Sequence, residues 1–78
     1  MIGCECFEGK IILVFDDFTI REILLETLEE LQSTNLIQRN GINESLEKAV
    51  DFAVDKELQA IAITTTTTVY IFDFDYLF

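Results

Sequence analysis

Residues 10–22, which read Lys-Ile-Ile-Leu-Val-Phe-Asp-Asp-Phe-Thr-Ile-Arg-Glu, contain a predicted strand followed by the start of a predicted helix. Residues 10–15 are apolar on both alternating faces, a pattern typical of a strand that is central in its sheet and covered on both sides. Thr19 and Glu22 have the spacing of a capping box, in which each side chain pairs with a free amide of the first helical turn. The stretch therefore predicts a strand that runs into a helix.

The predicted first helix begins at Thr19 and separates apolar from acidic side chains. At about 100° per residue, one side carries an apolar stripe made of Ile20, Ile23, Leu24, Thr27, Leu28 and Leu31, with Leu25 off the stripe. The opposite side carries Glu22, Glu26, Glu29 and Glu30. Leu36 and Ile37 lie between turn-forming residues at 33–35 and 40–41, which predicts a very short strand there.

A second amphipathic helix is predicted from Asn43, which can cap its first turn. Its buried stripe consists of Leu46, Ala49, Val50, Ala53 and Val54, and an adjacent acidic stripe consists of Glu44, Glu47, Asp51 and Asp55. Phe52 faces away from the buried stripe. It is either packed under a neighbouring loop or exposed as a contact residue.

Residues 60–63 and 69–72 are rich in strand-forming side chains and predict a C-terminal β-hairpin, with its bend within the threonine run 64–68. Alternation places Tyr70, Phe72, Phe74, Tyr76 and Phe78 on one face of the last strand. Near the N-terminus, Glu8 and Gly9 can turn the chain, so residues 1–7 are predicted to pair antiparallel with residues 10–15.

These elements predict one α/β domain over residues 1–78. We expect a small two-layer sandwich, with the two amphipathic helices packed on a mixed sheet of three or four strands that includes the C-terminal hairpin. The strands at residues 10–15 and 60–63 would be parallel and joined by a right-handed crossover.

Fifteen acidic and five basic residues give the 78-residue chain a formal charge of -10, and it has no histidine. This charge repels phosphate backbones and anionic membranes, whereas a basic protein surface is attracted. The longest fully apolar run, residues 11–15, is far below the roughly 20 residues that cross a bilayer, so we expect a cytoplasmic protein. Cys4 and Cys6 are read as reduced, partly buried thiols or as ligands of a metal shared by two chains.

Residues 10–17, followed by Ile20, Arg21, Glu22 and Leu24, resemble the opening of a bacterial response-regulator receiver domain, and the resemblance extends to about Thr64. It implies an Mg²⁺ site at Asp16 and Asp17, which match the acidic pair of that family. The family's phosphate-accepting aspartate is absent, because the strand at residues 60–63 ends in Thr64. The resemblance therefore implies a truncated and inactive relative.

Residues 71–75, Ile-Phe-Asp-Phe-Asp, look like the first motif of haloacid dehalogenase-type phosphatases. That motif precedes the rest of its active site, and only three residues follow it here, so Asp73 and Asp75 are read as charges that keep an edge strand soluble. With no imidazole to act as a base, we predict no catalytic residue, no resident metal and no cofactor.

The remaining signal is the acidic surface, which predicts a non-catalytic regulator or inhibitor that binds a basic, possibly nucleic-acid-binding, surface of a partner protein. Small anti-defence inhibitors of phages and mobile elements work this way. The predicted partner-binding residues are Glu22, Glu26, Glu29, Glu30, Glu44, Glu47, Asp51, Asp55 and Phe52.

Three alternatives stay open. The carboxylates can form a merely solvated face. The chain can also be a receiver-like signalling adaptor that binds a kinase or regulator through the first helix, with Leu25 or Phe52 as apolar anchors. Lastly, it can form a homodimer through an aromatic row made of Tyr70, Phe72, Phe74 and Tyr76.

Overall fold

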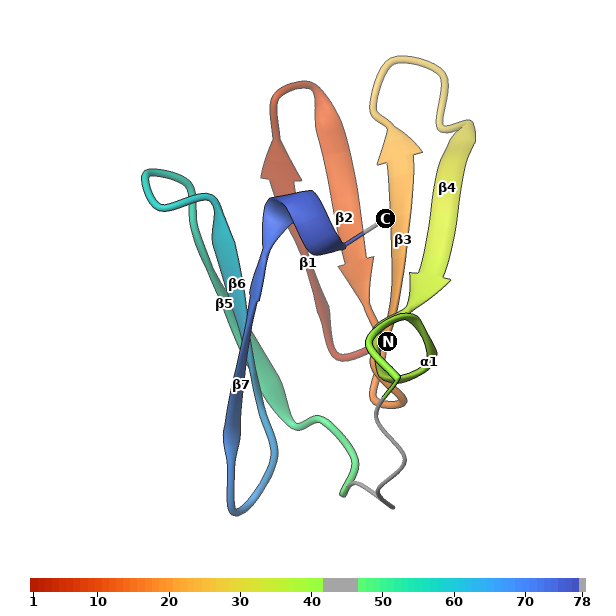
Figure 1. Ribbon diagram of the computed structural model, residues 1–78. Coiled ribbons are helices and arrows are strands. Elements are labelled where there is room, and N and C mark those ends of the chain that lie inside the picture. Colours follow the sequence, from red (N-terminus) through yellow and green to blue (C-terminus); the bar gives the residue numbers. More distant parts are fainter. Residues whose placement is uncertain (42–46, 78) are drawn as a thin grey trace.

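The computed structural model, which describes residues 1–41 and 47–77 and leaves out the side chain of Tyr76, consists of two antiparallel sheets (Figure 1). The first sheet has the order β1 (Gly3–Phe7), β2 (Lys10–Val14), β3 (Thr19–Leu24) and β4 (Glu30–Asn35). The second has the order β5 (Asp51–Asp55), β6 (Ala60–Thr64) and β7 (Val69–Asp73). A single α-helical turn, α1 (Leu36–Arg39), follows β4, and a 3₁₀ turn, η1 (Phe74–Tyr76), follows β7. The predicted sandwich of two helices on a mixed sheet is therefore wrong.

The N-terminal hairpin is confirmed. Phe7 lies opposite Lys10 in the β1–β2 register, so Glu8 and Gly9 form a two-residue loop. Both loop residues have positive φ, 50° and 76°, which is the feature of the type I′ turn that matches the twist of paired strands. As predicted, β2 is an inner strand of its sheet, since it pairs with β1 on one edge and with β3 on the other.

Where the first helix was predicted, the chain forms β3 and the turn that leads into β4. Ile20 lies opposite Val14 in the β2–β3 register, and both side chains are fully buried. An isolated helix of this length is marginal in water, whereas an apolar strand already in place offers a row of backbone partners and an apolar face. The capping-box residues have other partners: the Thr19 amide donates to Asp17 Oδ1 at 3.0 Å, and Glu22 accepts from Gln32.

The second predicted helix is also wrong over its described part. Its cap, Asn43, lies outside the described residues, and residues 51–55 form β5 with alternating burial. Phe52 and Val54 point toward the core, whereas Asp51, Ala53 and Asp55 are exposed. A strand pairing that buries every second residue replaces the helical stripe here.

Two smaller predictions also need correction. The short strand predicted at Leu36 and Ile37 is α1, because the Asn35 side chain accepts hydrogen bonds from the Ile37 and Gln38 amides and so caps a helical turn. The strands predicted to be parallel, now β2 and β6, belong to different sheets, and every strand pair in residues 1–41 and 47–77 is antiparallel.

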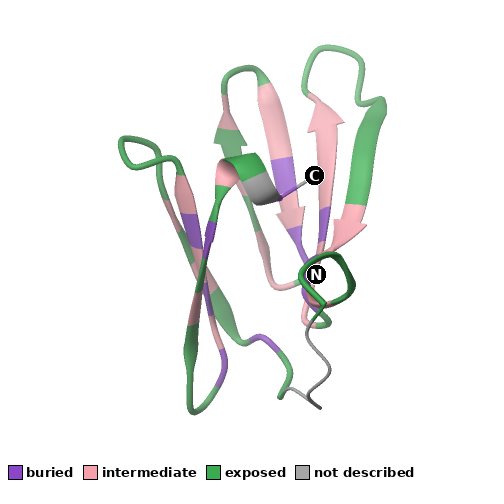
Figure 2. Cartoon of the chain, viewed as in Figure 1, coloured by how far each residue is buried: buried purple, intermediate pink, exposed green. Residues whose placement is uncertain are grey.

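The core lies between the two sheets, and Figure 2 shows the buried positions on strands of both. Its members are Ile12, Val14, Phe18, Ile20, Leu36, Ala49, Ile61, Ile63, Phe72 and Leu77. The Phe18 ring meets Tyr70 of β7 edge to face, with ring centroids 5.6 Å apart. Gly3 lets β1 approach β5, because a Cβ on Gly3 would lie 2.6 Å from the Phe52 ring. Each sheet thus covers the core with one face and leaves its other face outward.

The C-terminal hairpin is confirmed, and its turn lies at residues 65–68, where the Thr65 amide donates to the Thr68 carbonyl at 2.9 Å. The Thr65 hydroxyl is buried and accepts from the amides of Thr67 and Thr68, which explains how a run without glycine can turn. Of the predicted aromatic row, Phe72 is in the core, and Tyr70 and Phe74 pack against it. Those three rings therefore face the core of their own chain. The Tyr76 side chain and Phe78 lie outside the described residues.

Candidate binding site on the outer face of the second sheet

The outer face of the second sheet is a regular grid, because β5, β6 and β7 are in register and alternate side chains point outward. Phe52, Ile61 and Phe72 mark the opposite, core side. The outward rows are Asp51, Thr64 and Val69, then Ala53, Ala62 and Ile71, then Asp55, Ala60 and Asp73. Small apolar residues therefore occupy the centre of the face, and aspartates occupy three of its corners. We call this surface the aspartate-cornered face.

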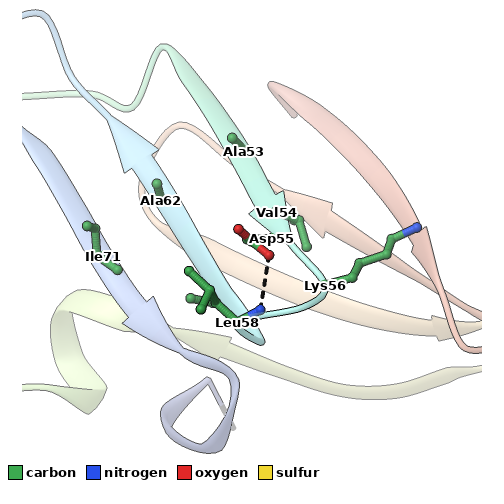
Figure 3. Close-up of a pocket in the computed structure, with 8 residues that line it drawn as sticks. Ala53, Val54, Asp55, Lys56, Leu58, Ala62 and Ile71 are labelled. Carbon is green, nitrogen blue, oxygen red and sulfur yellow. Dashed lines mark hydrogen bonds between the residues drawn. The ribbon is translucent and has the colours of Figure 1, made fainter.

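A shallow hollow of about 520 Å³ lies over the alanines of this face. Ala53 and Ala62 form its floor, and Ile71 and Leu58 rise at its sides, as Figure 3 shows. Alanine next to a larger side chain leaves such a depression in an otherwise flat sheet. Leu58 is 75% exposed and Ile71 is 72% exposed, so two apolar side chains border the hollow and face water. Apolar surface of this kind favours contact with another molecule.

Asp55 shapes one end of the hollow. Its Oδ1 atom accepts hydrogen bonds from the amides of Glu57 and Leu58, each at 3.0 Å. These bonds hold the turn between β5 and β6, and with it the position of Leu58 beside the hollow (Figure 3). Asp55 therefore supports the local backbone while its side chain remains exposed.

The three corner carboxylates lack basic partners among the described residues. Within the described residues, the ion pairs join Lys10 to Glu22, Arg21 to Glu30, Lys48 to Asp16, and Lys56 to Glu5. None of these pairs includes Asp51, Asp55 or Asp73. Lys56 borders the hollow, but its Nζ lies 3.4 Å from Glu5 on the first sheet. The aspartate-cornered face therefore carries an uncompensated negative charge.

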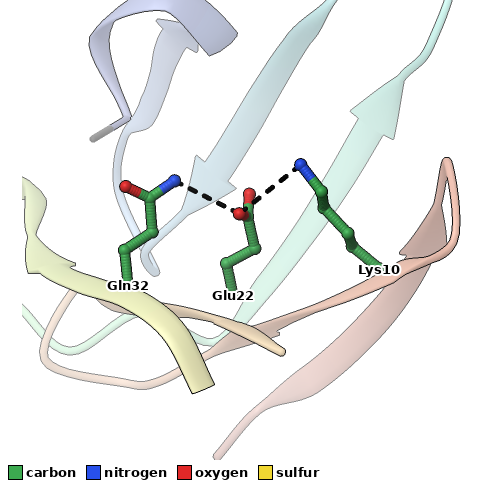
Figure 4. Close-up of polar contacts among 3 residues, drawn as sticks. All are labelled: Lys10, Glu22 and Gln32. Atoms are coloured by element: carbon green, nitrogen blue, oxygen red, sulfur yellow. Dashed lines mark hydrogen bonds and ion pairs between the residues drawn. The ribbon is translucent and has the colours of Figure 1, made fainter. Parts of the chain in front are cut away.

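The four carboxylates predicted to line the first helix are not gathered into one stripe. Glu22 points to the core side of β3, where its side chain is 12% exposed, 3.7 Å from Lys10 and 3.2 Å from the Gln32 amide (Figure 4). Glu30 pairs with Arg21. Glu26 and Glu29 are exposed in the turn between β3 and β4. The two turn residues alone offer free charge, and we call them the hairpin carboxylates.

The second predicted acidic set is also divided. Glu44 lies outside the described residues. Glu47 accepts hydrogen bonds from the hydroxyls of Thr66 and Thr67, and these bonds hold the pKa of its carboxyl below the usual value. Asp51 and Asp55 do share one face of β5, at its two ends. Phe52 is half-buried and packs against the core, away from that face.

Asp73 is the corner residue that the predicted set of binding residues lacks. The alternation of residues 69–73 already separated Asp73 from the aromatic side chains, but no local signal placed it beside Asp55. That neighbourhood arises from Ala60, which pairs with Asp55 on one side and with Asp73 on the other.

The residues considered for metal binding do not form such a site in the described part of the chain. Asp16 pairs with Lys48, and Asp17 accepts from the Thr19 amide. Cys4 and Cys6 lie on one side of β1, as their spacing predicts, but both are exposed and not partly buried as expected. In residues 1–41 and 47–77, no three His, Cys, Asp or Glu side chains are grouped so that they could hold a metal ion.

No helix in the described part of the chain has the length and apolar character needed to cross a bilayer. Comparisons with models of known protein families, with curated proteins and with solved structures find no match to this chain. The resemblance to receiver domains accordingly stays a prediction.

Proposed function

We propose that this protein is a non-catalytic regulator or inhibitor that binds a basic surface of a partner protein through the aspartate-cornered face. One observation carries the proposal: an exposed apolar hollow, with Asp55 in its lining, lies on a sheet face whose three corner carboxylates have no basic partner in the described structure. This surface replaces the helix stripes expected from the sequence.

Lysine and arginine side chains fit such a surface because each combines an apolar stem with a cationic end. A stem can cover Ala53 and Ala62 while the charged end reaches a corner such as Asp51 or Asp73. Hydrogen bonds between oppositely charged groups are stronger than neutral ones, and the field of the face raises the rate of encounter. The apolar floor adds contact area that carboxylates alone would lack.

A partner that normally binds nucleic acid fits this chemistry best. Such proteins expose clustered lysine and arginine side chains for phosphates, and an acidic protein can occupy the same cluster. The net charge of -10 supports binding to a basic protein and disfavours direct binding to phosphate backbones. We therefore propose inhibition by competition with nucleic acid. The exposed free thiols of Cys4 and Cys6 favour a reducing compartment such as the cytoplasm.

The proposal is tested by quantitative capture of partner proteins with two charge-matched double variants. Asp51→Lys with Asp73→Lys reverses two corners of the face. Asp55 is kept because it holds a turn. Glu26→Lys with Glu29→Lys makes the same charge change at the hairpin carboxylates. Circular dichroism confirms that both variants are folded.

We expect the corner variant to lose the partner and the hairpin variant to retain it. Capture by the unmodified chain should also fall as salt is raised, because exposed charge pairs are screened. Equal loss in both variants would show that total charge alone acts, and loss only in the hairpin variant would move the site to the β3–β4 turn. Either result refutes the proposed face.

A further inference from the structure

We propose that the outer face of the first sheet is an interface with a second copy of this chain. Ile12 and Val14 of β2 point into the core, so Ile11 and Leu13 point outward. Ile23 of β3 lies opposite Ile11 and shares its face. These three outward side chains are half-buried, yet they do not belong to the apolar residues packed against the core. Among the described residues, the core is built on the opposite side of this sheet.

The sequence of β2 supports contact between the outward side of this strand and another molecule. A run that is apolar on both alternating faces is typical of a strand buried on both sides, and within one chain the structure buries one side only. Cys4 lies opposite Leu13, and Cys6 lies opposite Ile11, which extends the weakly polar area onto β1. This face therefore has the composition of an interface rather than of a solvated sheet.

Charge favours a second copy over a basic partner as the occupant. In the outward register of the four strands, Arg21 and Glu30 are the charged residues of the described structure, and they form an ion pair with each other. The face is thus close to neutral on a chain whose net charge is -10. Two copies can meet here with little repulsion, whereas a basic partner gains nothing from it. The aspartate-cornered face would repel its own copy.

The dimensions suit a weak twofold dimer. Four strands about 4.8 Å apart and five residues of about 3.3 Å each give a flat footprint of roughly 320 Å². This footprint is smaller than the about 800 Å² per partner of a standard interface, so we expect weak association. Two such faces would pack about 10 Å apart, as facing sheets do. The aspartate-cornered faces would then point outward at opposite ends of the dimer, free for partners.

Sedimentation velocity tests the dimer across low micromolar to submillimolar concentration, with a reductant present so that no disulfide forms. Leu13→Lys alters the proposed interface, and Ile71→Lys makes an equivalent apolar-to-cation change on the other sheet. Both variants lower the net negative charge equally, so their difference reports position and not total charge. Circular dichroism checks folding, and Leu13→Thr, which keeps a strand-forming residue, is the second variant if Leu13→Lys does not fold.

We expect the unmodified chain to reach the mass of two chains as concentration rises. Leu13→Lys should weaken association by at least about tenfold, since it buries an unpaired charge, and Ile71→Lys should leave association unchanged. The inference is overturned if the unmodified chain stays a monomer throughout. It is also overturned if Leu13→Lys associates as well as the unmodified chain, or if Ile71→Lys weakens association equally.

Discussion

A double-mutant cycle between Phe18 and Tyr70 probes the packing of one sheet on the other. Phe18 belongs to the turn between β2 and β3, is 1% exposed, and has a positive φ of 69°. Its ring meets Tyr70 on β7 at an interplanar angle of 87°. Edge-to-face pairs contribute about 0.5–1.5 kcal/mol beyond the area they bury, so Phe18→Leu and Tyr70→Leu should show coupling of that size.

Leucine replaces each ring in this cycle because alanine would remove too much of the chain's stability. Phe→Ala in a core costs about 3–5 kcal/mol, whereas a chain of 78 residues has a total stability of roughly 4–12 kcal/mol. Urea unfolding of the single and double variants gives the coupling, and Phe18→Leu with Ile71→Ala is the control, because Ile71 is on the outer face. Additivity of the Phe18 and Tyr70 changes within about 0.3 kcal/mol would refute this packing of the sheets.

Three further predictions concern the turns. Thr65→Val removes the hydroxyl that accepts hydrogen bonds from two amides, and it should lower the free energy of unfolding by about 1–2 kcal/mol in urea titrations. An unchanged free energy would show that the threonine run forms its turn without this hydroxyl. Glu8→Asn should raise stability by up to about 1 kcal/mol, since asparagine tolerates the positive φ of this position, and a lower melting temperature would contradict the type I′ assignment. Glu47 has a lowered pKa in the folded chain, so its contribution is present above the unfolded value of 4.5 and is lost as pH falls through the folded value. NMR shifts of Thr66 and Thr67 should follow that titration and lose it in Glu47→Gln.

Both terminal hairpins could be predicted because their signals are local. Glu8 and Gly9 separate two apolar runs by two residues, which leaves a tight turn as the direct solution. In β7, alternation correctly placed Tyr70 and Phe72 on one face, since a strand has a fixed period of two, and the structure shows that this face is the core side. These features required no knowledge of which strand lies beside which.

The two helix predictions were wrong because the same apolar residues fit both the periodicity of a helix and that of a strand. Ile20, Ile23 and Leu24 share one side of a helix, yet Ile20 and Leu24 also share one face of a strand. The capping spacing of Thr19 and Glu22 favoured the helix, but pairing with β2 gives the segment a ladder of backbone hydrogen bonds and a buried face. Local propensity cannot weigh a partner that is distant in the sequence.

The candidate site was predicted only in part for a related reason. Asp51 and Asp55 were named from the acidic spacing of a helix, and they share one face because a strand repeats every two residues. Asp73 joins them through Ala60, which is a consequence of the register across three strands. Spacing within one segment identifies the first two corners, and only the sheet identifies the third.

NMR mapping of the bound partner locates the binding surface without any substitution. The partner recovered by capture is added to the isotope-labelled chain, and the methyl signals of Ala53, Ala62 and Ile71 are followed together with the backbone amides. We predict that these methyls shift and broaden first, and that the changes weaken as salt is added. Changes confined to the turn that holds Glu26 and Glu29, with the three methyls unaffected, would contradict docking on the aspartate-cornered face.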